Sequence, residues 1–345
     1  MTVAVGLLYE AIIVGSVIGS AALVSMGLIW FLLPWLVRYA IARPNARSSH
    51  HLPTPQGGGG AVVVATLAVA WGAILLSPAF LQNQAWQFLA VTAAAALLAV
   101  VGAIDDIRTL PAPARLALQS IAVAAVIVAL PNELQISPQV PWWIERAYLF
   151  LGGLWFVNLV NFMDGIDWMT VAEVVPVTAA IALLGLYGAI ELLPTLVAAA
   201  LLGAILGFAP FNKPVARLFL GDVGSLPIGL LLGWLLLRLA GTGHLAAAFI
   251  LPFYYLVDAT ITLLRRIVHR ERFWEAHRSH FYQRATDNGF SVPVIVAHVA
   301  LVNLVLAALA LITVAADRTL VSLTALALSS AVVAWLLLTF ARTKR

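Results

Sequence analysis

Long apolar runs alternate with short polar breaks along the whole chain, and this pattern predicts membrane-spanning helices. A helix needs about 20 mostly apolar residues to cross the hydrocarbon core of a bilayer. Polar residues, Gly and Pro interrupt such runs and divide the chain into eleven segments. They lie near residues 11–37, 58–79, 86–104, 114–131, 146–162, 168–190, 193–210, 218–240, 244–265, 291–315 and 319–340. The sequence therefore predicts an all-α integral membrane protein, a polytopic bundle of about 11 transmembrane helices.

Composition supports this interpretation over the full length. Of the 345 residues, 63% are apolar and 10% are charged, whereas soluble domains average about 45–50% and about 25%. The mean hydropathy is +1.01. These values exclude a soluble enzyme, a disordered tail and a nucleic-acid-binding protein, although the sequence pI is about 9.7. We therefore expect a single transmembrane domain over residues 1–345, with the lipid bilayer and no nucleic acid among its partners.

The basic residues predict how the bundle is oriented. Cytoplasmic loops of membrane proteins carry an excess of Lys and Arg. One set of alternate loops, together with the C-terminal tail, holds 16 of the 19 basic residues. These are Arg38, Arg43, Arg47, Arg108, Arg115, Lys213, Arg217, Arg265, Arg266, Arg270, Arg272, Arg278, Arg284, Arg342, Lys344 and Arg345. The sequence therefore predicts a periplasmic N-terminus, a cytosolic C-terminus and cytosolic loops at about 38–57, 105–113, 163–167, 211–217 and 266–290.

Five of the 15 acidic residues fall on the same predicted face. They are Asp105, Asp106, Asp164, Asp167 and Asp222, in short cytosolic loops or at the helix ends beside them. Carboxylates that converge at one depth repel one another, which raises their pKa values or recruits a cation. Oxygen ligands without any Cys favour Mg²⁺ or Mn²⁺ over zinc, and Mg²⁺ also holds substrate phosphates. The pattern predicts a divalent-metal site at the cytosolic end of the bundle.

Structural roles for these carboxylates compete with the functional ones. Asp105 and Asp106 lie at the C-terminal end of a helix, where the macrodipole disfavours negative charge, so capping does not explain them. One of Asp164 and Asp167 fits the N-cap of the next helix. Asp222 fits an ordinary N-cap as well as it fits a functional role.

Two predicted cytosolic loops combine Arg with His. The loop after the ninth span contains His277, Arg278 and His280, and the loop after the first span contains Arg47 and His50. Arg and His both donate to phosphate oxygens, and Arg does so bidentately. Much of the charge in these loops also fits a role in orienting the protein alone.

Two glycine-rich stretches are each compatible with two roles, phosphate binding and close helix packing. They are Gly57 to Gly60 and the run from Phe219 to Ser225. Glycines at a helix N-terminus let the backbone approach a phosphate, and glycines within helices permit close helix packing.

Acidic residues and a metal that face Arg and His at a water–lipid boundary favour phosphoryl transfer between a soluble nucleotide and a lipid. A polyprenyl phosphate keeps its tail in the bilayer and its phosphate at the interface, where a site at this depth reaches it. The main barrier is repulsion between the lipid phosphate and the diphosphate under attack, so cations contribute more than proton abstraction does. A lipid phosphate with a second pKa of about 6 is largely ionised at neutral pH, so a general base helps but is not essential.

Four stretches carry most of these polar residues in a fixed order. They run from Asp105 to Leu110, from Asn158 to Asp167, from Phe211 to Ser225 and from Ala276 to His280. Together they resemble the polyprenyl-phosphate N-acetylhexosamine-1-phosphate transferases (glycosyltransferase family 4). This family includes the phospho-MurNAc-pentapeptide translocase and the enzymes that initiate O-antigen, enterobacterial common antigen and teichoic acid synthesis. The stretch from Arg43 to Pro55 is most similar to the O-antigen-initiating branch. The resemblance covers roughly residues 40–290.

The resemblance implies an activity and a set of roles. Such enzymes lie in the bacterial inner membrane and use Mg²⁺ to transfer sugar-1-phosphate from a UDP-linked N-acetylhexosamine, or a 6-deoxy derivative, to undecaprenyl phosphate, with release of UMP. Asp105 and Asp106 would be the catalytic pair that engages the lipid phosphate or the metal, and Asp222 would be the main Mg²⁺ ligand. The implied substrate-binding residues are Asn161, Asp164, Asp167 and Asn212 around the nucleotide, Phe219 stacked on uracil, His277, Arg278 and His280 at the diphosphate or sugar, and Arg47 and His50.

Attack by the lipid phosphate on the β-phosphorus in one step is the preferred route, and a two-step route through a phospho-aspartate stays open. Two positions depart from the pattern. Trp168 stands where relatives usually have Gly, and Gln56 stands where an Arg is common. Trp168 either narrows the choice of sugar or anchors its helix at the interface, and we favour the anchor because interfacial Trp is common.

The composition also fits other classes of membrane protein. A flippase or secondary transporter would place ionisable groups near the bilayer midplane. Only Asp258 and His298 are clear candidates near the middle of a predicted span, and Asp258 also fits a hydrogen bond to a neighbouring helix. A structural scaffold leaves the one-sided acidic residues unexplained. A homodimer is compatible with the sequence, which does not define the oligomeric state.

Overall fold

The computed structural model describes residues 2–42, 53–76, 81–271 and 277–343, so Arg47 and His50 lie outside the described residues. Within this part the chain is a bundle of α-helices with one short two-stranded antiparallel pairing, in which Ile41 faces Pro55. The elements are α1 (Thr2–Tyr39), β1 (Ile41–Ala42), β2 (Thr54–Pro55), α2 (Gly58–Leu75), α3 (Leu81–Ile107), α4 (Ala112–Val128), α5 (Trp142–Met163), α6 (Met169–Leu186), α7 (Leu192–Phe208), α8 (Asp222–Gly241), α9 (Leu245–Ile250), α10 (Phe253–Val268), α11 (Phe281–Asp287), α12 (Val292–Ala316) and α13 (Thr319–Ala341). The predicted all-α fold is confirmed.

The predicted spans coincide with helices, with one break. The ninth span, 244–265, is divided into α9 and α10 by a turn at Pro252, because proline has no N–H to continue a helix. The longest predicted loop, 266–290, contains the end of α10 and all of α11. Among the described residues, seven helices are long and apolar enough to cross a membrane, and α4 and α7 are shorter apolar helices. The chain is therefore a multi-pass membrane protein.

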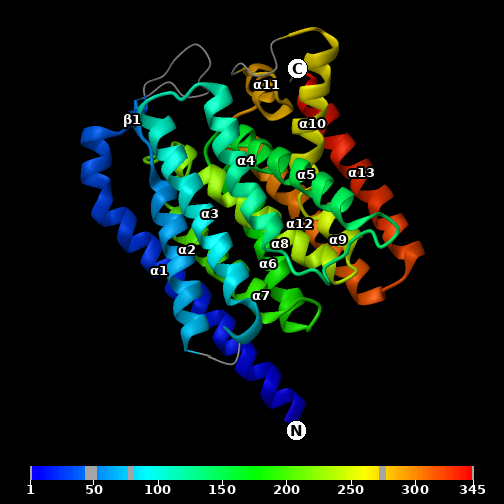
Figure 1. Ribbon diagram of the computed structural model, residues 1–345. Coiled ribbons are helices and arrows are strands. Elements are labelled where there is room, and N and C mark those ends of the chain that lie inside the picture. The colour runs from blue at the N-terminus through cyan, green and yellow to red at the C-terminus, as the bar shows by residue number, and fades with distance from the viewer. Residues whose placement is uncertain (1, 43–52, 77–80, 272–276, 344–345) are drawn as a thin grey trace.

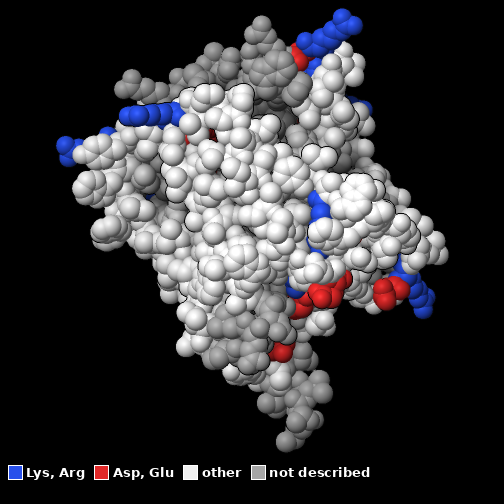
Figure 2. All heavy atoms as spheres, viewed as in Figure 1, with Lys and Arg blue, Asp and Glu red and all other residues white. Residues whose placement is uncertain are grey.

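The outer surface of the bundle is apolar. Large side chains such as Trp30, Leu76 and Trp86 are 77%, 86% and 70% exposed. Exposure of such a large apolar surface to water is unfavourable, whereas its contact with lipid tails is not. In Figure 2 the coloured Lys, Arg, Asp and Glu side chains gather mainly toward the two ends of the molecule, and most of the surface between them is uncharged.

Two buried helices organise the bundle. α7 packs against α1, α2 and α6, and α8 packs against α3, α5 and α2. The two termini lie at opposite ends of the bundle, and α11 lies at the end opposite the N-terminus (Figure 1). The C-terminal ends of α3 and α5 and the N-terminal end of α8 meet at one end of the bundle, which we call the acidic end.

Glycines allow the helices at the acidic end to approach closely. A Cβ on Gly59 of α2 would lie 2.2 Å from the Cα of Gly224 of α8, and a Cβ on Gly102 of α3 would lie 2.2 Å from the carbonyl oxygen of Asp222. Backbone atoms cannot move aside as a flexible side chain can. The glycines of the first glycine-rich stretch therefore serve close packing in this structure, one of the two readings of the sequence.

We expect Gly59→Ala to destabilise the bundle, because the added methyl group forces α2 and α8 apart at a cost of about 1–3 kcal/mol. Gly72→Ala lies in the same helix and is the matched control. A Cβ at Gly72 meets no atom within 4 Å, so this change should be neutral or stabilising by up to about 1 kcal/mol. Thermal unfolding of both purified variants in one detergent tests this, and equal transitions would contradict the packing role.

Candidate active site

Asp106 caps the N-terminus of α8 from another helix. Its Oδ1 accepts a hydrogen bond from the backbone N–H of Asp222 at 3.0 Å, and its Oδ2 accepts one from Val223 at 3.1 Å. Gly221, just before α8, has a φ of +76°, and a Cβ there would lie 2.6 Å from Oδ2 of Asp106. Only glycine meets both requirements easily. Asp106 therefore determines where α8 begins and where the side chain of Asp222 lies.

Asp105 is held by a cation. Arg115 of α4 donates to its Oδ2 at 2.9 Å, and the backbone N–H of Leu110 donates to its Oδ1 at 2.6 Å. The same NH1 atom of Arg115 lies 3.8 Å from Oδ2 of Asp222. Arg115 thus stands between two carboxylates that would otherwise repel each other.

Asp222 is the more accessible of these two carboxylates. Its side chain is 29% exposed, against 5% for Asp105. Asn161, in the last turn of α5, donates to Oδ1 of Asp222 at 2.8 Å and to the hydroxyl of Ser225 at 2.9 Å. Oδ2 of Asp222 lies 3.8 Å from Arg115, and this partly exposed carboxylate can accept a ligand from solution.

Asp164 follows α5 and adds a further negative group. The hydroxyl of Thr170 donates to its Oδ1. Desolvation within the site raises the pKa of Asp164 to about 8, and the charges of Asp222 and Asp106 act in the same direction. The structure therefore brings Asp105, Asp106, Asp164 and Asp222 into one interacting group, with Asn161 between α5 and α8.

Asp167 and Asn212 bind backbone groups. Oδ2 of Asp167 accepts from the N–H of Ala216 at 2.9 Å, and Asn212 accepts from the N–H of Trp168 at 2.7 Å while it donates to the carbonyl of Leu218 at 2.9 Å. They connect the loop before α6 to the loop between α7 and α8. In this structure they shape the boundary of the acidic group.

Trp168 also belongs to this connection. It has a φ of +63°, a backbone region that glycine adopts at little cost, and its indole N–H donates to the carbonyl of Ala209 at 2.7 Å. The indole is thereby fixed to the loop that follows α7. The backbone of Phe219 binds the segment before and at the start of α2: its N–H donates to the carbonyl of Pro55, and its carbonyl accepts from the N–H of Gly58.

The histidine residues lie on the segment that leads into α11. The rings of His277 and His280 stack with centroids 5.0 Å apart. Arg278 donates to Thr286 and Asp287 at 3.1 and 3.2 Å. Burial lowers the pKa of His277 to about 4, and the charge of His280 adds to the shift, so this imidazole is neutral at physiological pH.

A tyrosine joins this segment to the loop that holds Asp164. The hydroxyl of Tyr282 donates to the carbonyl of Phe162 at 3.0 Å, and a Cβ on Gly165 would lie 2.1 Å from the same hydroxyl. The histidine segment therefore packs directly on the residues beside Asp164.

The side chains at the acidic end fit a Mg²⁺ site that is completed by water and substrate phosphates, rather than a site made of protein ligands alone. In the described part of the chain no three acidic or histidine side chains converge as a complete metal site. Mg²⁺, however, usually keeps several waters and takes one or two carboxylates together with substrate phosphates. Asp222, whose side chain is 29% exposed, and Asp164, whose charge interacts with it, fit that need.

Sequence reasoning missed several contributors to the site. Arg115 entered only through the orientation of the bundle, Gln56 only as a departure from the pattern, Ser225 only as the end of a glycine-rich stretch, and Thr170 not at all. The amide of Gln56 donates to the carbonyl of Asp106 at 2.8 Å. A basic residue ten positions after an acidic pair was a signal for Arg115, but nothing in the sequence places it between Asp105 and Asp222.

Comparisons with known proteins support the resemblance of the motifs. Residues 88–240 match glycosyl transferase family 4. This range includes the four clustered aspartates and ends before the histidine segment. This match agrees with the resemblance of the motifs, and the names of the family and of the relatives indicate a phosphotransferase.

Its relatives act on prenyl phosphates and cell-wall precursors, according to their names. The chain is 28% identical over 73% of its length to 71% of the "Probable undecaprenyl-phosphate N-acetylglucosaminyl 1-phosphate transferase" of Bacillus subtilis. It is 32% identical over 56% of its length to 52% of the decaprenyl-phosphate N-acetylglucosaminephosphotransferase of Mycolicibacterium smegmatis. A phospho-N-acetylmuramoyl-pentapeptide-transferase of Wolbachia pipientis is 37% identical over 26% of this chain and 29% of its own length.

The contacts predict that two aspartates differ in their contribution to stability. Asp106→Ala removes both acceptors at the start of α8 and should cost about 1–2 kcal/mol. Asp222→Ala loses the hydrogen bond from Asn161 and the longer contact to Arg115 but relieves repulsion among the carboxylates, so its stability should stay within about 0.5 kcal/mol of the wild type. Thermal unfolding in detergent, without added metal, measures both. Equal losses would contradict the capping role of Asp106.

Proposed function

We propose that this protein transfers N-acetylhexosamine 1-phosphate from a UDP-linked sugar to undecaprenyl phosphate, with release of UMP. The product, a sugar linked to the lipid through a diphosphate, would begin a cell-surface glycan such as O-antigen. The observation that carries the proposal is the acidic group formed by Asp105, Asp106, Asp164 and Asp222, in a chain related to prenyl-phosphate sugar phosphotransferases.

The reaction exchanges one phosphoanhydride bond for another. An oxygen of the lipid phosphate bonds to the β-phosphorus, the bond from that phosphorus to the bridging oxygen breaks, and UMP leaves with the electron pair. When bound at Asp222 and Asp164, Mg²⁺ would neutralise the diphosphate and ease the departure of UMP. Asn161 orients Asp222 through its amide, and Arg115 supplies a fixed positive charge beside Asp105.

The orientation of the bundle follows the basic residues. Arg108, Arg115, Arg278 and Arg284 belong to the loops and helices at the acidic end. Since Lys and Arg mark the cytoplasmic side, we place the acidic end in the cytosol of a bacterium, at the inner membrane. UDP-sugars are soluble there, and the phosphate of the acceptor lies at the same depth.

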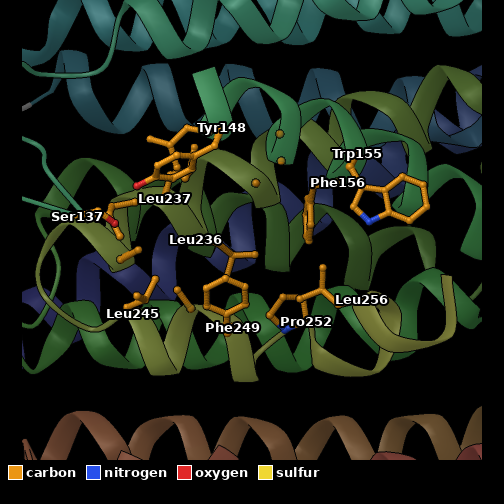
Figure 3. Close-up of a pocket in the computed structure, with 17 residues that line it drawn as sticks. Ser137, Tyr148, Trp155, Phe156, Leu236, Leu237, Leu245, Phe249, Pro252 and Leu256 are labelled. Atoms are coloured by element: carbon orange, nitrogen blue, oxygen red, sulfur yellow. The ribbon is translucent and has the colours of Figure 1, made fainter. Parts of the chain in front are cut away.

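An apolar cavity is suited to the prenyl chain. It has a volume of about 490 Å³ and lies between α5, α8 and α9–α10. Figure 3 shows Tyr148, Trp155, Phe156 and Phe249 around it. Trp155 and Phe156 line the cavity, and Phe156 precedes Asn161 by five residues of α5, which is about 8 Å along the helix. A prenyl chain in this cavity would hold its phosphate near the acidic group.

Gly152→Leu should narrow this cavity and weaken the binding of long acceptors. Gly152 lines the cavity, and a Cβ there meets no atom within 4 Å, so the variant should fold. Displacing two buried CH₂ groups costs roughly 1.6 kcal/mol, or about tenfold in KM for undecaprenyl phosphate. The KM for a prenyl phosphate of two isoprene units should not change. Gly72→Leu, outside the cavity, is the control, and an equal KM effect there would contradict this location.

The activity is tested with purified protein in lipid nanodiscs. Radiolabelled UDP-GlcNAc, undecaprenyl phosphate and Mg²⁺ should yield organic-extractable label together with an equal amount of UMP, and EDTA should abolish both until Mg²⁺ is restored. Asp222→Ala should lower kcat by at least about 100-fold. A panel of UDP-sugars identifies the donor. If no sugar in the panel is transferred, the proposal is wrong and a flippase or transporter becomes the better reading.

A further inference from the structure

One face of α10 carries four polar side chains into the protein. Tyr254, Asp258, Thr262 and Arg266 are spaced four residues apart, so they lie on one side of the helix. They are 0%, 0%, 2% and 8% exposed. An ionisable group buried in a membrane helix is costly and marks a functional position by default. The proposed reaction gives Asp258 no role.

Asp258 gathers hydrogen-bond donors from its own helix. The hydroxyl of Tyr254 donates to its Oδ2 at 3.2 Å, and the hydroxyl of Thr262 donates to its Oδ1 at 3.3 Å. These two side chains lie one turn before and one turn after it. They fix the rotation of the carboxylate on α10.

The same carboxylate also binds the histidine segment. The backbone N–H of Phe281 donates to Oδ1 at 3.0 Å, and that of Tyr282 lies 3.4 Å from Oδ2. Nδ1 of His280 lies 3.4 Å from Oδ1. Asp258 is therefore the point where α10 holds both the backbone and the imidazole of this segment.

A carboxylate at Nδ1 determines the state of a histidine. It favours the tautomer that carries the proton on Nδ1, and it leaves Nε2 on the opposite side of the ring. The ring of His280 stacks on that of His277 at 5.0 Å and on that of Tyr282 at 5.9 Å. These contacts hold the direction of the imidazole and favour one tautomer before any substrate binds.

We propose that Asp258 is a positioning residue: it acts through His280, whose Nε2 and stacked neighbour His277 it presents to the diphosphate of the donor. The inference rests on the proposed function and adds a residue to it. Capping alone does not call for this arrangement, because a Ser, Thr or Asn at the start of α11 satisfies the same amides without a buried charge.

The tautomer gives a test that needs no turnover. Protein labelled with ¹⁵N-histidine in lipid bilayers should show one imidazole protonated at Nδ1 whose signal is absent from His280→Ala. In Asp258→Asn, whose amide can donate to Nδ1, that signal should change to the Nε2-protonated form. A wild-type His280 with its proton on Nε2 overturns the proposal.

Kinetics give the second test. Asp258→Asn should lower kcat by about 10–100-fold and change the KM for undecaprenyl phosphate by less than about twofold. In the His280→Ala background the same change should cost nothing further, because the two residues act as a unit. If Asp258→Asn lowers kcat in the His280→Ala background by the same factor as in the wild type, Asp258 acts independently of His280, and the proposal is overturned.

Glu173→Gln is the matched control. Glu173 is a buried carboxylate of α6, 1% exposed, that accepts a hydrogen bond from Asn303 of α12 at 2.7 Å, outside the histidine segment. Its kcat should stay within about threefold of the wild type. No transfer by the wild-type protein would remove the proposed function and leave the tautomer test to decide on Asp258. Transfer with an unchanged kcat in Asp258→Asn would remove only the positioning role.

Discussion

The hydrogen bonds from the N-terminus of α8 to the carboxylate of Asp106 hold the acidic end together. They join a helix that ends at the site to one that begins there, and they depend on glycines at 102 and 221 that leave room for the contact. Asp222 is the first residue of α8, so its place is a consequence of this cap. An anion at a helix N-terminus is favourable, and one at a C-terminal end is not. Asp106, at the end of α3, is stabilised by the dipole of α8 instead of its own helix.

This arrangement divides the aspartates by environment. Arg115 and a backbone amide satisfy Asp105, and two amides satisfy Asp106. Asp164 and Asp222 are less compensated: Thr170 donates to Asp164, and Asn161 donates to Asp222 while Arg115 lies 3.8 Å away. Desolvation raises the pKa of Asp164 to about 8, and the neighbouring carboxylates add to the shift. Residues of the same type thus differ in what they can bind. Asp164 and Asp222 are suited to a cation that also binds a phosphate, and Asp106 places Asp222.

The helices on either side of Pro252, α9 and α10, contribute to the apolar cavity and to the contacts of the histidine segment. α9 and α10 line the apolar cavity together with α5 and α8, while α10 also carries the contacts to the histidine segment. Tyr282 then joins this segment to the end of α5. α10 therefore connects the cavity proposed for the prenyl chain with the histidine segment proposed to meet the diphosphate of the donor.

The sequence by itself determined the all-helical membrane fold, because apolar runs long enough for a bilayer leave the backbone no other way to satisfy its hydrogen bonds. It also grouped the aspartates on one face, since the order of spans fixes which loops share a side. It did not determine what each carboxylate contacts. Arg115 and Asp222, or Asp258 and His280, are separated by many residues, and neither spacing nor composition carries their distance. In the sequence Asp258 is an isolated acidic residue within a span, and only the packing of α11 against α10 shows its partners. Only the tertiary structure, through helix contacts set by glycines and a proline, decided which acids are held and which are left to bind.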